Sequence, residues 1–197
     1  MSQMPNASTV LSVFNDAASA FHHIADLIPT HRECSIEITN DSSQYILSNP
    51  GVYLESGSCS EPLPPEIEPS SSGKALFTKT ANTARGVVGV VTYDLVDEST
   101  QECAGKMAVM FSVPYDFNLY SNWYAVGVFE EGEECSFDLY DHMYNNTDST
   151  FVRGRASESS LSHEGELVAI LASMSDSYQP MIKVEVKDVC QEEDECL

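Results

Sequence analysis

The chain has 197 residues, of which 42% are hydrophobic and 20% are charged, so its composition is that of one folded domain and excludes wholesale disorder. Nine basic residues stand against 31 acidic ones, and the formal net charge of −22 at pH 7 repels nucleic-acid phosphates, which excludes a nucleic-acid-binding protein. The nine cations do not cluster along the chain, so we expect no attraction to anionic lipids, and any membrane partner would be zwitterionic or neutral.

No targeting segment is recognised at the start of the chain. Residues 1–5 contain no basic side chain, and no apolar run long enough for the core of a signal peptide follows them. No stretch approaches the roughly 18 apolar residues of a spanning helix, so the folded monomer is expected to be soluble. We therefore expect a secreted or cytoplasmic protein that meets a target cell membrane only when it is active.

Residues 9–28 carry the one long helical pattern of the sequence. At about 100° per residue the polar side chains fall within an arc of roughly 120°, and the apolar ones occupy the other side. Thr9 is a suitable N-cap, and Pro29 ends the pattern after about 20 residues, a length of roughly 30 Å that equals the hydrocarbon thickness of a bilayer. The apolar face of this predicted amphipathic helix includes Val10, Val13, Phe14, Ala17, Phe21, Ile24 and Ile28.

From Ser35 onward the hydrophobic period becomes that of β-strands. Eight short strands are predicted, over residues 35–39, 44–54, 74–79, 87–95, 106–113, 123–129, 167–174 and 181–186. The segment 58–73 contains four prolines, so it cannot supply central strands and is expected to form loops.

One short helix is predicted among the strands, because Ser136 can cap a segment in which apolar and aromatic residues recur at helical spacing. The expected fold is therefore mainly β, a β-sandwich flanked by two short α-helices of which the N-terminal one is amphipathic. We expect an N-terminal helix segment over residues 1–33, a β-sandwich membrane-binding domain over 34–188 and an acidic tail over 189–197.

Catalytic and metal-binding signatures are absent from the sequence. There is no nucleophile elbow, zinc-protease motif, P-loop or Cys-x-x-Cys pair. His163 and Glu164 are expected to form an ordinary surface pair in a loop, and Arg153 and Arg155 to be solvated arginines of a turn. The six cysteines fit reduced thiols in an unexported protein, although an oxidising compartment would permit disulfides. We predict a protein that is not an enzyme and needs no cofactor or metal.

Aromatic residues are concentrated in residues 111–124, which include the only tryptophan. Pro114 and Asn118 break the strand pattern, so these rings are expected to lie on a loop. Tyrosine and tryptophan prefer the wet boundary of a bilayer, and suitably spaced rings attract a quaternary ammonium by about 0.5–2 kcal/mol each. The cluster therefore suits choline headgroups, and the alternative is that the rings simply fill an edge of the sandwich.

The run of residues 111–123, with Tyr-Ser-Asn-Trp at 120–123, resembles the signature of the actinoporins and actinoporin-like pore-forming cytolysins. Similar pieces are Tyr-Leu-Glu-Ser-Gly at 53–57, Gly-Lys-Ala-Leu-Phe at 73–77 and Gly-Val-Val-Gly-Val-Val-Thr-Tyr at 86–93. The resemblance extends in order from about Cys34 to Lys187, and the acidic character is similar to that of the vertebrate actinoporin-like branch.

The resemblance implies a β-sandwich flanked by two helices, the first of which detaches, inserts and oligomerises into a pore. It also implies a phosphocholine site that recognises sphingomyelin. By motif position that site would comprise Ser56, Val88, Ser112, Pro114, Tyr120, Tyr140 and Tyr144. Trp123, Tyr115 and Leu119 are assigned by the same resemblance and by the aromatic cluster to the membrane interface.

Several positions depart from the family pattern. Glu55 stands where an arginine precedes the headgroup serine, and it is expected to repel a lipid phosphate. Leu119 replaces a loop tryptophan, Asn145 replaces a tyrosine, and Arg155 replaces the aspartate of an Arg-Gly-Asp motif. The departures at Glu55, Leu119 and Asn145 predict a weakened specificity for sphingomyelin.

The leading hypothesis is a soluble monomer that docks on a choline-headgroup membrane, sphingomyelin or phosphatidylcholine, releases residues 9–28 and forms a homo-oligomeric pore. Asp16 and Asp26 on the polar side predict cation preference, which protonation of His22 and His23 below about pH 6.5 would weaken. The alternatives are a non-lytic, lectin-like lipid- or glycan-binding module with the same sandwich and an adaptor bound through its acidic surface.

Overall fold

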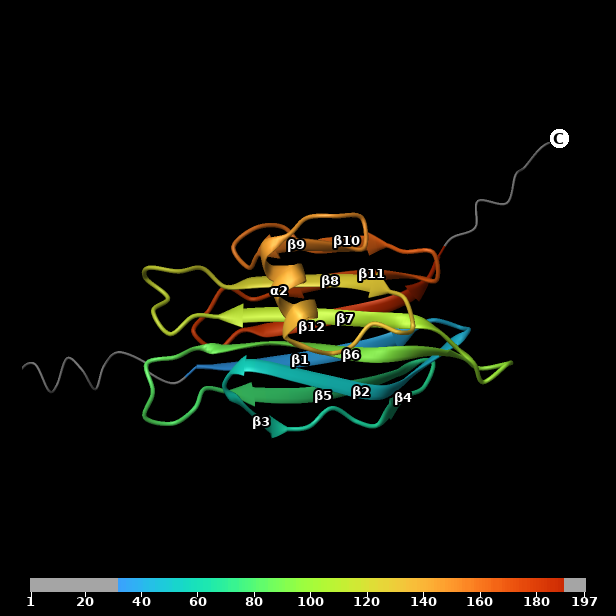
Figure 1. The fold of residues 1–197 in the computed structure, drawn as a ribbon, viewed down its shortest axis with the longest axis horizontal. Coiled ribbons are helices and arrows are strands. Elements are labelled where there is room, and N and C mark those ends of the chain that lie inside the picture. Colours follow the sequence, from blue (N-terminus) through green and yellow to red (C-terminus); the bar gives the residue numbers. More distant parts are fainter. Residues whose placement is uncertain (1–31, 190–197) are drawn as a thin grey trace, which may run out of the picture. The chain divides into compact units, whose positions relative to one another are not determined.

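The computed structural model describes residues 32–189, which form two six-stranded sheets and one helix, α2 (Phe137–Asn145) (Figure 1). The first sheet has the order β10-β11-β12-β1-β5-β3, and the second has the order β4-β2-β6-β7-β8-β9. The strands are β1 (Glu33–Asp41), β2 (Tyr45–Ser56), β3 (Ser58–Glu61), β4 (Glu66–Ile67), β5 (Ser71–Thr78), β6 (Val87–Asp97), β7 (Cys103–Val113), β8 (Trp123–Phe129), β9 (Phe151–Arg155), β10 (Leu161–Glu164), β11 (Val168–Met174) and β12 (Met181–Asp188).

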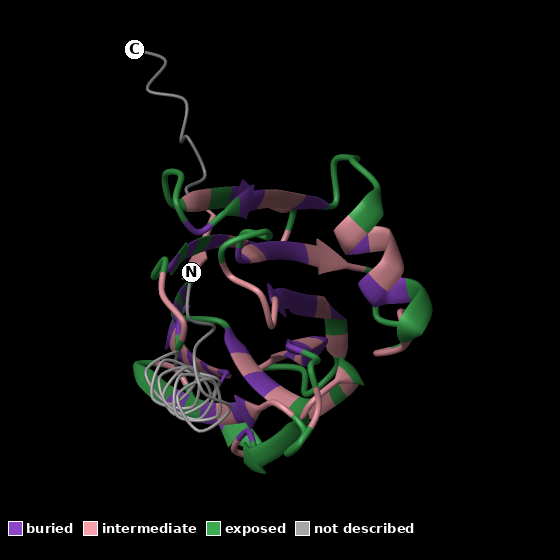
Figure 2. Cartoon of the chain, turned by 90° about the vertical axis from the view of Figure 1, so that its left-hand side faces the viewer, coloured by how far each residue is buried: buried purple, intermediate pink, exposed green. Residues whose placement is uncertain are grey.

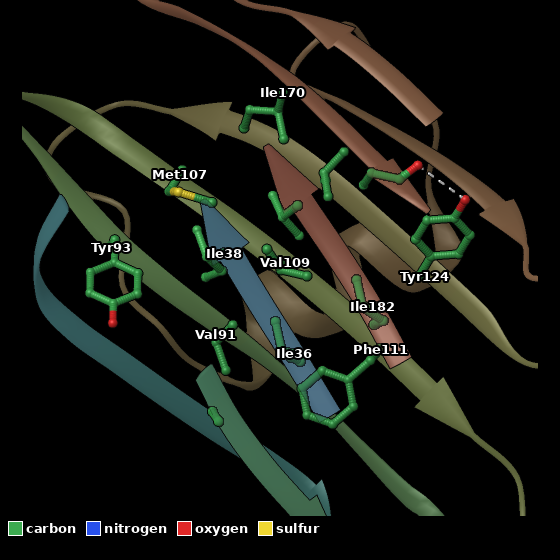
Figure 3. Close-up of a cluster of buried hydrophobic side chains, with 14 of the residues drawn as sticks. Ile36, Ile38, Val91, Tyr93, Met107, Val109, Phe111, Tyr124, Ile170 and Ile182 are labelled. Carbon is green, nitrogen blue, oxygen red and sulfur yellow. Dashed lines mark hydrogen bonds between the residues drawn. The ribbon is translucent and has the colours of Figure 1, made fainter. Parts of the chain in front are cut away.

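The two sheets pack face to face as a sandwich. Along β1 and β12 every second residue is buried, as expected for strands with one face on the core and one in solvent. Ile36 and Ile38 of β1 belong to the same core cluster as Val109 and Phe111 of β7, and Figure 3 shows these side chains between the sheets. The β-sandwich prediction is thereby confirmed.

The second sheet is covered on both faces at its centre. In β7 all residues from Met107 to Val113 are buried, because odd-numbered residues face the first sheet and even-numbered ones face α2. Helix α2 packs Leu139 and Met143 against Val90 and Met110 of the sheet. Its N-cap is Ser136, which confirms the predicted short helix. Within residues 32–189 there is no helix that is long and apolar enough to cross a membrane.

Four strands were not predicted, and they are the four edges of the two sheets: β3, β4, β9 and β10. The expectation of loops throughout 58–73 is wrong, since β3 and β4 lie there, although neither is central. Arg153 and Arg155 lie on β9 and His163 and Glu164 on β10, not in loops. The predicted helix over residues 9–28 lies outside the described residues, and the boundaries at 33 and 188 stay predictions.

His163 gives the fold a specific pH dependence. It is buried while its neighbour Glu164 is exposed, so the two do not act as a surface pair. Burial lowers the pKa of His163, against a smaller opposing effect of Asp148. Below about pH 6.5 the His163 side chain therefore binds a proton more readily in the unfolded chain than in the folded chain. The stability that neutral His163 contributes above this pH is lost as the pH falls.

We expect the free energy of unfolding to decrease between pH 7.5 and 5.5 more steeply in the native sequence than in His163→Leu. Urea unfolding at several pH values in this window measures the two slopes. Equal slopes would contradict the assignment, because the carboxylates with lowered pKa, such as Asp148, lose their contribution only nearer pH 4.

Candidate functional site

A row of residues crosses five strands of the second sheet. The register aligns Ser56 of β2 with Val88 of β6, Val88 with Ser112 of β7, and Ser112 with Trp123 of β8. The row continues to Arg155 on β9. Directly paired residues of antiparallel strands have their side chains on one face of the sheet. Three predicted headgroup residues and Trp123 therefore lie side by side near the end of the sandwich where β2 and β7 finish (Figure 1).

Aromatic side chains of α2 and β2 form a compact group beside this row. The rings of Tyr140 and Tyr144 stack with their centroids 5.7 Å apart, and Tyr53 lies 6.4 Å from Tyr140. The edge of Phe137 meets Tyr53 at 6.3 Å. We call Tyr53, Phe137, Tyr140 and Tyr144 the aromatic face. Val88 belongs to the same hydrophobic cluster as the three tyrosines of the aromatic face, so it joins the row to that face.

Glu55 contributes a negative charge to the aromatic face. Its Oε2 accepts a hydrogen bond of 2.9 Å from the Tyr53 hydroxyl, and this bond is the main reason that the pKa of Tyr53 is raised. Burial is the main cause of the raised pKa of Tyr140, and the negative charge of Glu55 raises this pKa further. A carboxylate within electrostatic reach of several rings increases their attraction for a cation. Sequence reasoning gave no role to Tyr53, whose pairing with Val90 places it beside α2.

The loop over residues 114–122 presents exposed apolar surface at its tip. Leu119 is 74% exposed and Tyr120 65% exposed, the two highest values among the large hydrophobic side chains of residues 32–189. Asp116 holds the turn, because its carboxylate accepts hydrogen bonds from the backbone N–H groups of Asn118 and Leu119. A fixed turn with an exposed ring and an exposed leucine is suited to the interfacial region of a bilayer.

The base of this loop is fastened to the sandwich. Arg32 is buried and donates hydrogen bonds to the carbonyl oxygens of Pro114, at 3.2 Å, and Tyr115, at 2.7 Å. The Lys79 ammonium lies 5.1 Å from the centroid of the Tyr115 ring. Tyr115 is thus half-buried with two cations close to its ring, whereas Leu119 and Tyr120 are exposed at the tip.

The predicted headgroup residues therefore form two groups. Val88, Tyr140 and Tyr144 share one cluster, to which the row adds Ser56 and Ser112. Pro114 and Tyr120 belong to the loop that follows β7, and within residues 32–189 Tyr120 makes no ring contact with either tyrosine of α2. The first group is joined by register and side-chain contacts, the second lies in the loop, and the assignment of both groups to a headgroup site stays a prediction.

Cations gather at this end of the sandwich, which faces the viewer in Figure 2. Five of the nine basic residues lie in or beside its loops or against Trp123: Arg32, Lys79, Arg85, Arg153 and Arg155. The cations are scattered along the chain, as the sequence analysis stated, but the fold brings these five to the same end of the sandwich. The prediction that anionic lipids exert no attraction loses its basis.

The fold itself is shared with a known class of protein. The solved structure of the lipid-binding protein Nakanori matches 87% of this chain and 79% of that protein, with a TM-score of 0.62 at 12% sequence identity. At this identity the match establishes the sandwich architecture alone.

The family follows from the sequence comparisons. The family model described as sea anemone cytotoxic protein matches residues 7–185, and the chain belongs to this family, which confirms the actinoporin-like resemblance. Bryoporin from Physcomitrium patens is 30% identical over 145 residues, 74% of this chain and 78% of bryoporin. DELTA-alicitoxin-Pse1b from Phyllodiscus semoni is 35% identical over 119 residues, 58% of this chain. The chain spans 48% of the length of that toxin.

Proposed function

We propose that this protein binds membranes and forms pores, and that it docks through choline-headgroup lipids such as sphingomyelin or phosphatidylcholine. The observation that carries the proposal is the meeting of the row through Ser56, Val88 and Ser112 with the stacked rings of Tyr140 and Tyr144. Membership in the sea anemone cytotoxic protein family supports the pore-forming activity.

The aromatic face suits the ammonium end of a phosphocholine group. A quaternary ammonium cannot donate a hydrogen bond, so it is held by the faces of aromatic rings and by negative charge. Tyr140 and Tyr144 supply stacked rings, and Glu55 supplies the charge. Glu55 then attracts the ammonium end of the lipid, which compensates for its repulsion of the phosphate.

The hydroxyl of Ser112 is the better placed of the two serines to meet the phosphate. Ser56 already donates its hydroxyl proton to the carbonyl oxygen of Gly86, at 2.9 Å. Ser112 lies between Val88 and Trp123 in the row. In the proposed complex it donates to a phosphate oxygen while Leu119 and Tyr120 enter the interfacial layer, which anchors the loop without an anionic lipid.

Permeabilisation would follow from insertion of residues 9–28, which lie outside the described part of the chain. Their apolar face would be buried in lipid, and the polar arc would face a water-filled lumen, which only an oligomer can enclose. Asp16 and Asp26 in that arc would line the lumen with carboxylates, so the pore would prefer cations.

Two variants of the full chain separate binding from pore formation. Phe14→Asp and Phe21→Asp place a charge on the predicted apolar face, at a cost of about 2.5–3.5 kcal/mol for each inserted helix. We expect calcein release from vesicles of sphingomyelin and phosphatidylcholine to fall at least tenfold, while co-sedimentation with the same vesicles is retained. Ser19→Asp, on the polar side, is the matched control and should still release calcein.

Each result has a distinct meaning in this experiment. Binding without release by the native chain would favour the non-lytic, lectin-like module, and neither binding nor release would overturn the proposed function. Equal release by Phe21→Asp and Ser19→Asp would show that the stripe of residues 9–28 does not enter the bilayer.

A further inference from the structure

Two arginines contact the indole of Trp123 at the end of the row. The guanidinium carbon Cζ lies 4.9 Å from the ring centroid in Arg153 and 5.0 Å in Arg155. Arg153 pairs with Ala125 and Arg155 with Trp123, so both arginines project to the face of the sheet that bears α2. We call Arg153, Trp123 and Arg155 the arginine clamp.

The clamp leaves its hydrogen-bond donors uncommitted. Contact with a ring uses the flat face of a guanidinium, whereas its N–H groups lie in the plane and remain able to bind an acceptor. Neither guanidinium forms a hydrogen bond or an ion pair with any residue of 32–189, whereas Lys74, Lys106 and Lys187 each pair with a carboxylate. The two like charges lie at most about 10 Å apart, because each is close to the same ring.

This arrangement is chemically suited to a phosphate. Each guanidinium group offers N–H donors in a planar fork that phosphate oxygens accept in pairs, and such bonds are about twice as strong as neutral ones. Trp123 adds an amphipathic ring that favours the headgroup layer. A phosphate held there would also offset the mutual repulsion of the two arginines.

We propose that the arginine clamp binds the phosphate of an anionic lipid headgroup, as a second site beside the choline site. This inference rests on the proposed docking of the same end of the sandwich on a bilayer. Glu55 and Ser56 are on β2 and Arg155 is on β9, four strand spacings away, or about 19 Å at the usual spacing. Only two carbon atoms join the phosphate and ammonium of phosphocholine, so a headgroup whose ammonium lies at Glu55 does not extend to Arg155.

The net charge of −22 does not prevent this contact, because interactions between exposed charges are largely screened beyond about 8 Å at physiological ionic strength. Glu158 is the carboxylate that competes locally. Its Oε2 accepts a hydrogen bond of 3.4 Å from the backbone N–H of Arg155. Its negative charge therefore weakens the attraction of the clamp for an anion.

The test compares two kinds of vesicle, one of sphingomyelin and phosphatidylcholine only and one that also contains phosphatidylserine. We expect Arg153→Gln with Arg155→Gln to bind the phosphatidylserine vesicles roughly 30-fold more weakly than the native chain, which corresponds to about 1 kcal/mol for each arginine. Binding to the choline-only vesicles should change less than twofold. Glu158→Gln should bind the phosphatidylserine vesicles more tightly than the native chain.

A control variant removes the same charge elsewhere. Lys74→Gln with Lys187→Gln changes two cations of the first sheet, both in ion pairs, and should bind both kinds of vesicle as the native chain does. Unchanged thermal unfolding of the arginine variant would show that it is folded.

Two results would overturn the second site. One is equal affinity of the arginine variant and the native chain for the phosphatidylserine vesicles. The other is an equal loss on both kinds of vesicle, which would assign the clamp to the choline site. If the native chain did not bind choline-only vesicles, this result would count against the proposed function. The arginine variant and the native chain could still be compared on phosphatidylserine vesicles.

Discussion

Replacing Tyr140 and Tyr144 together by leucine is expected to weaken binding to sphingomyelin or phosphatidylcholine vesicles by about fivefold to nearly a thousandfold. Each ring that contacts a quaternary ammonium contributes about 0.5–2 kcal/mol, and the two rings stack 5.7 Å apart. Leucine preserves most of the apolar packing beneath α2, where Tyr140 is buried. The loss would therefore report on the aromatic surface itself. Co-sedimentation or surface plasmon resonance on immobilised vesicles measures the effect.

A matched control lies on the same helix. Met143→Leu changes a fully buried side chain of α2 without removing a ring, and a swap of similar volume usually costs less than about 1.5 kcal/mol. It should bind vesicles as the native chain does. If the double tyrosine variant also bound as tightly as the native chain, the aromatic face would have no part in lipid recognition.

Phe111→Ala is expected to lower the free energy of unfolding by about 3–5 kcal/mol. Phe111 is fully buried, and its ring lies 5.0 Å from that of Phe77 across the two sheets. Removing it leaves a cavity between β7 and β5 that backbone hydrogen bonding prevents from closing. Such a loss is a large part of the 5–15 kcal/mol that stabilises a typical domain. Urea unfolding followed by tryptophan fluorescence measures it.

The contrasting variant is Leu119→Ala at the tip of the 114–122 loop. Leu119 is 74% exposed, so its removal should alter the free energy of unfolding by less than about 0.5 kcal/mol while weakening membrane binding. A cost below about 1 kcal/mol for Phe111→Ala would contradict the two-sheet core described here.

The central strands were predictable because burial on one or both faces leaves a strong apolar pattern. Val87 to Leu95 and Lys106 to Val113 are almost continuously apolar, which reflects their cover by the first sheet on one side and α2 on the other. The edge strands lack this pattern. β3 is exposed throughout, and β9 contains two arginines and a glycine, because an edge needs backbone pairing on one side only.

The candidate site was predictable where it depends on single strands and a short helix. The register aligns Val88 with Ser112, and Tyr140 of α2 shares a hydrophobic cluster with Val88, while their role in a headgroup site stays a prediction. The link between Glu55 and Tyr53 and the stacking of Arg153 and Arg155 on Trp123 depend on side-chain geometry and strand pairing. Such contacts leave no periodic signal in a sequence.

The attachment of Arg32 has a mechanical consequence for the loop over residues 114–122. Its guanidinium group is bonded to the backbone of the 114–122 loop, more than 80 positions along the sequence, and it also lies 4.6 Å from the Tyr178 ring. The start of β1 and the base of the loop that presents Leu119 and Tyr120 are therefore held together, although they are far apart in the sequence.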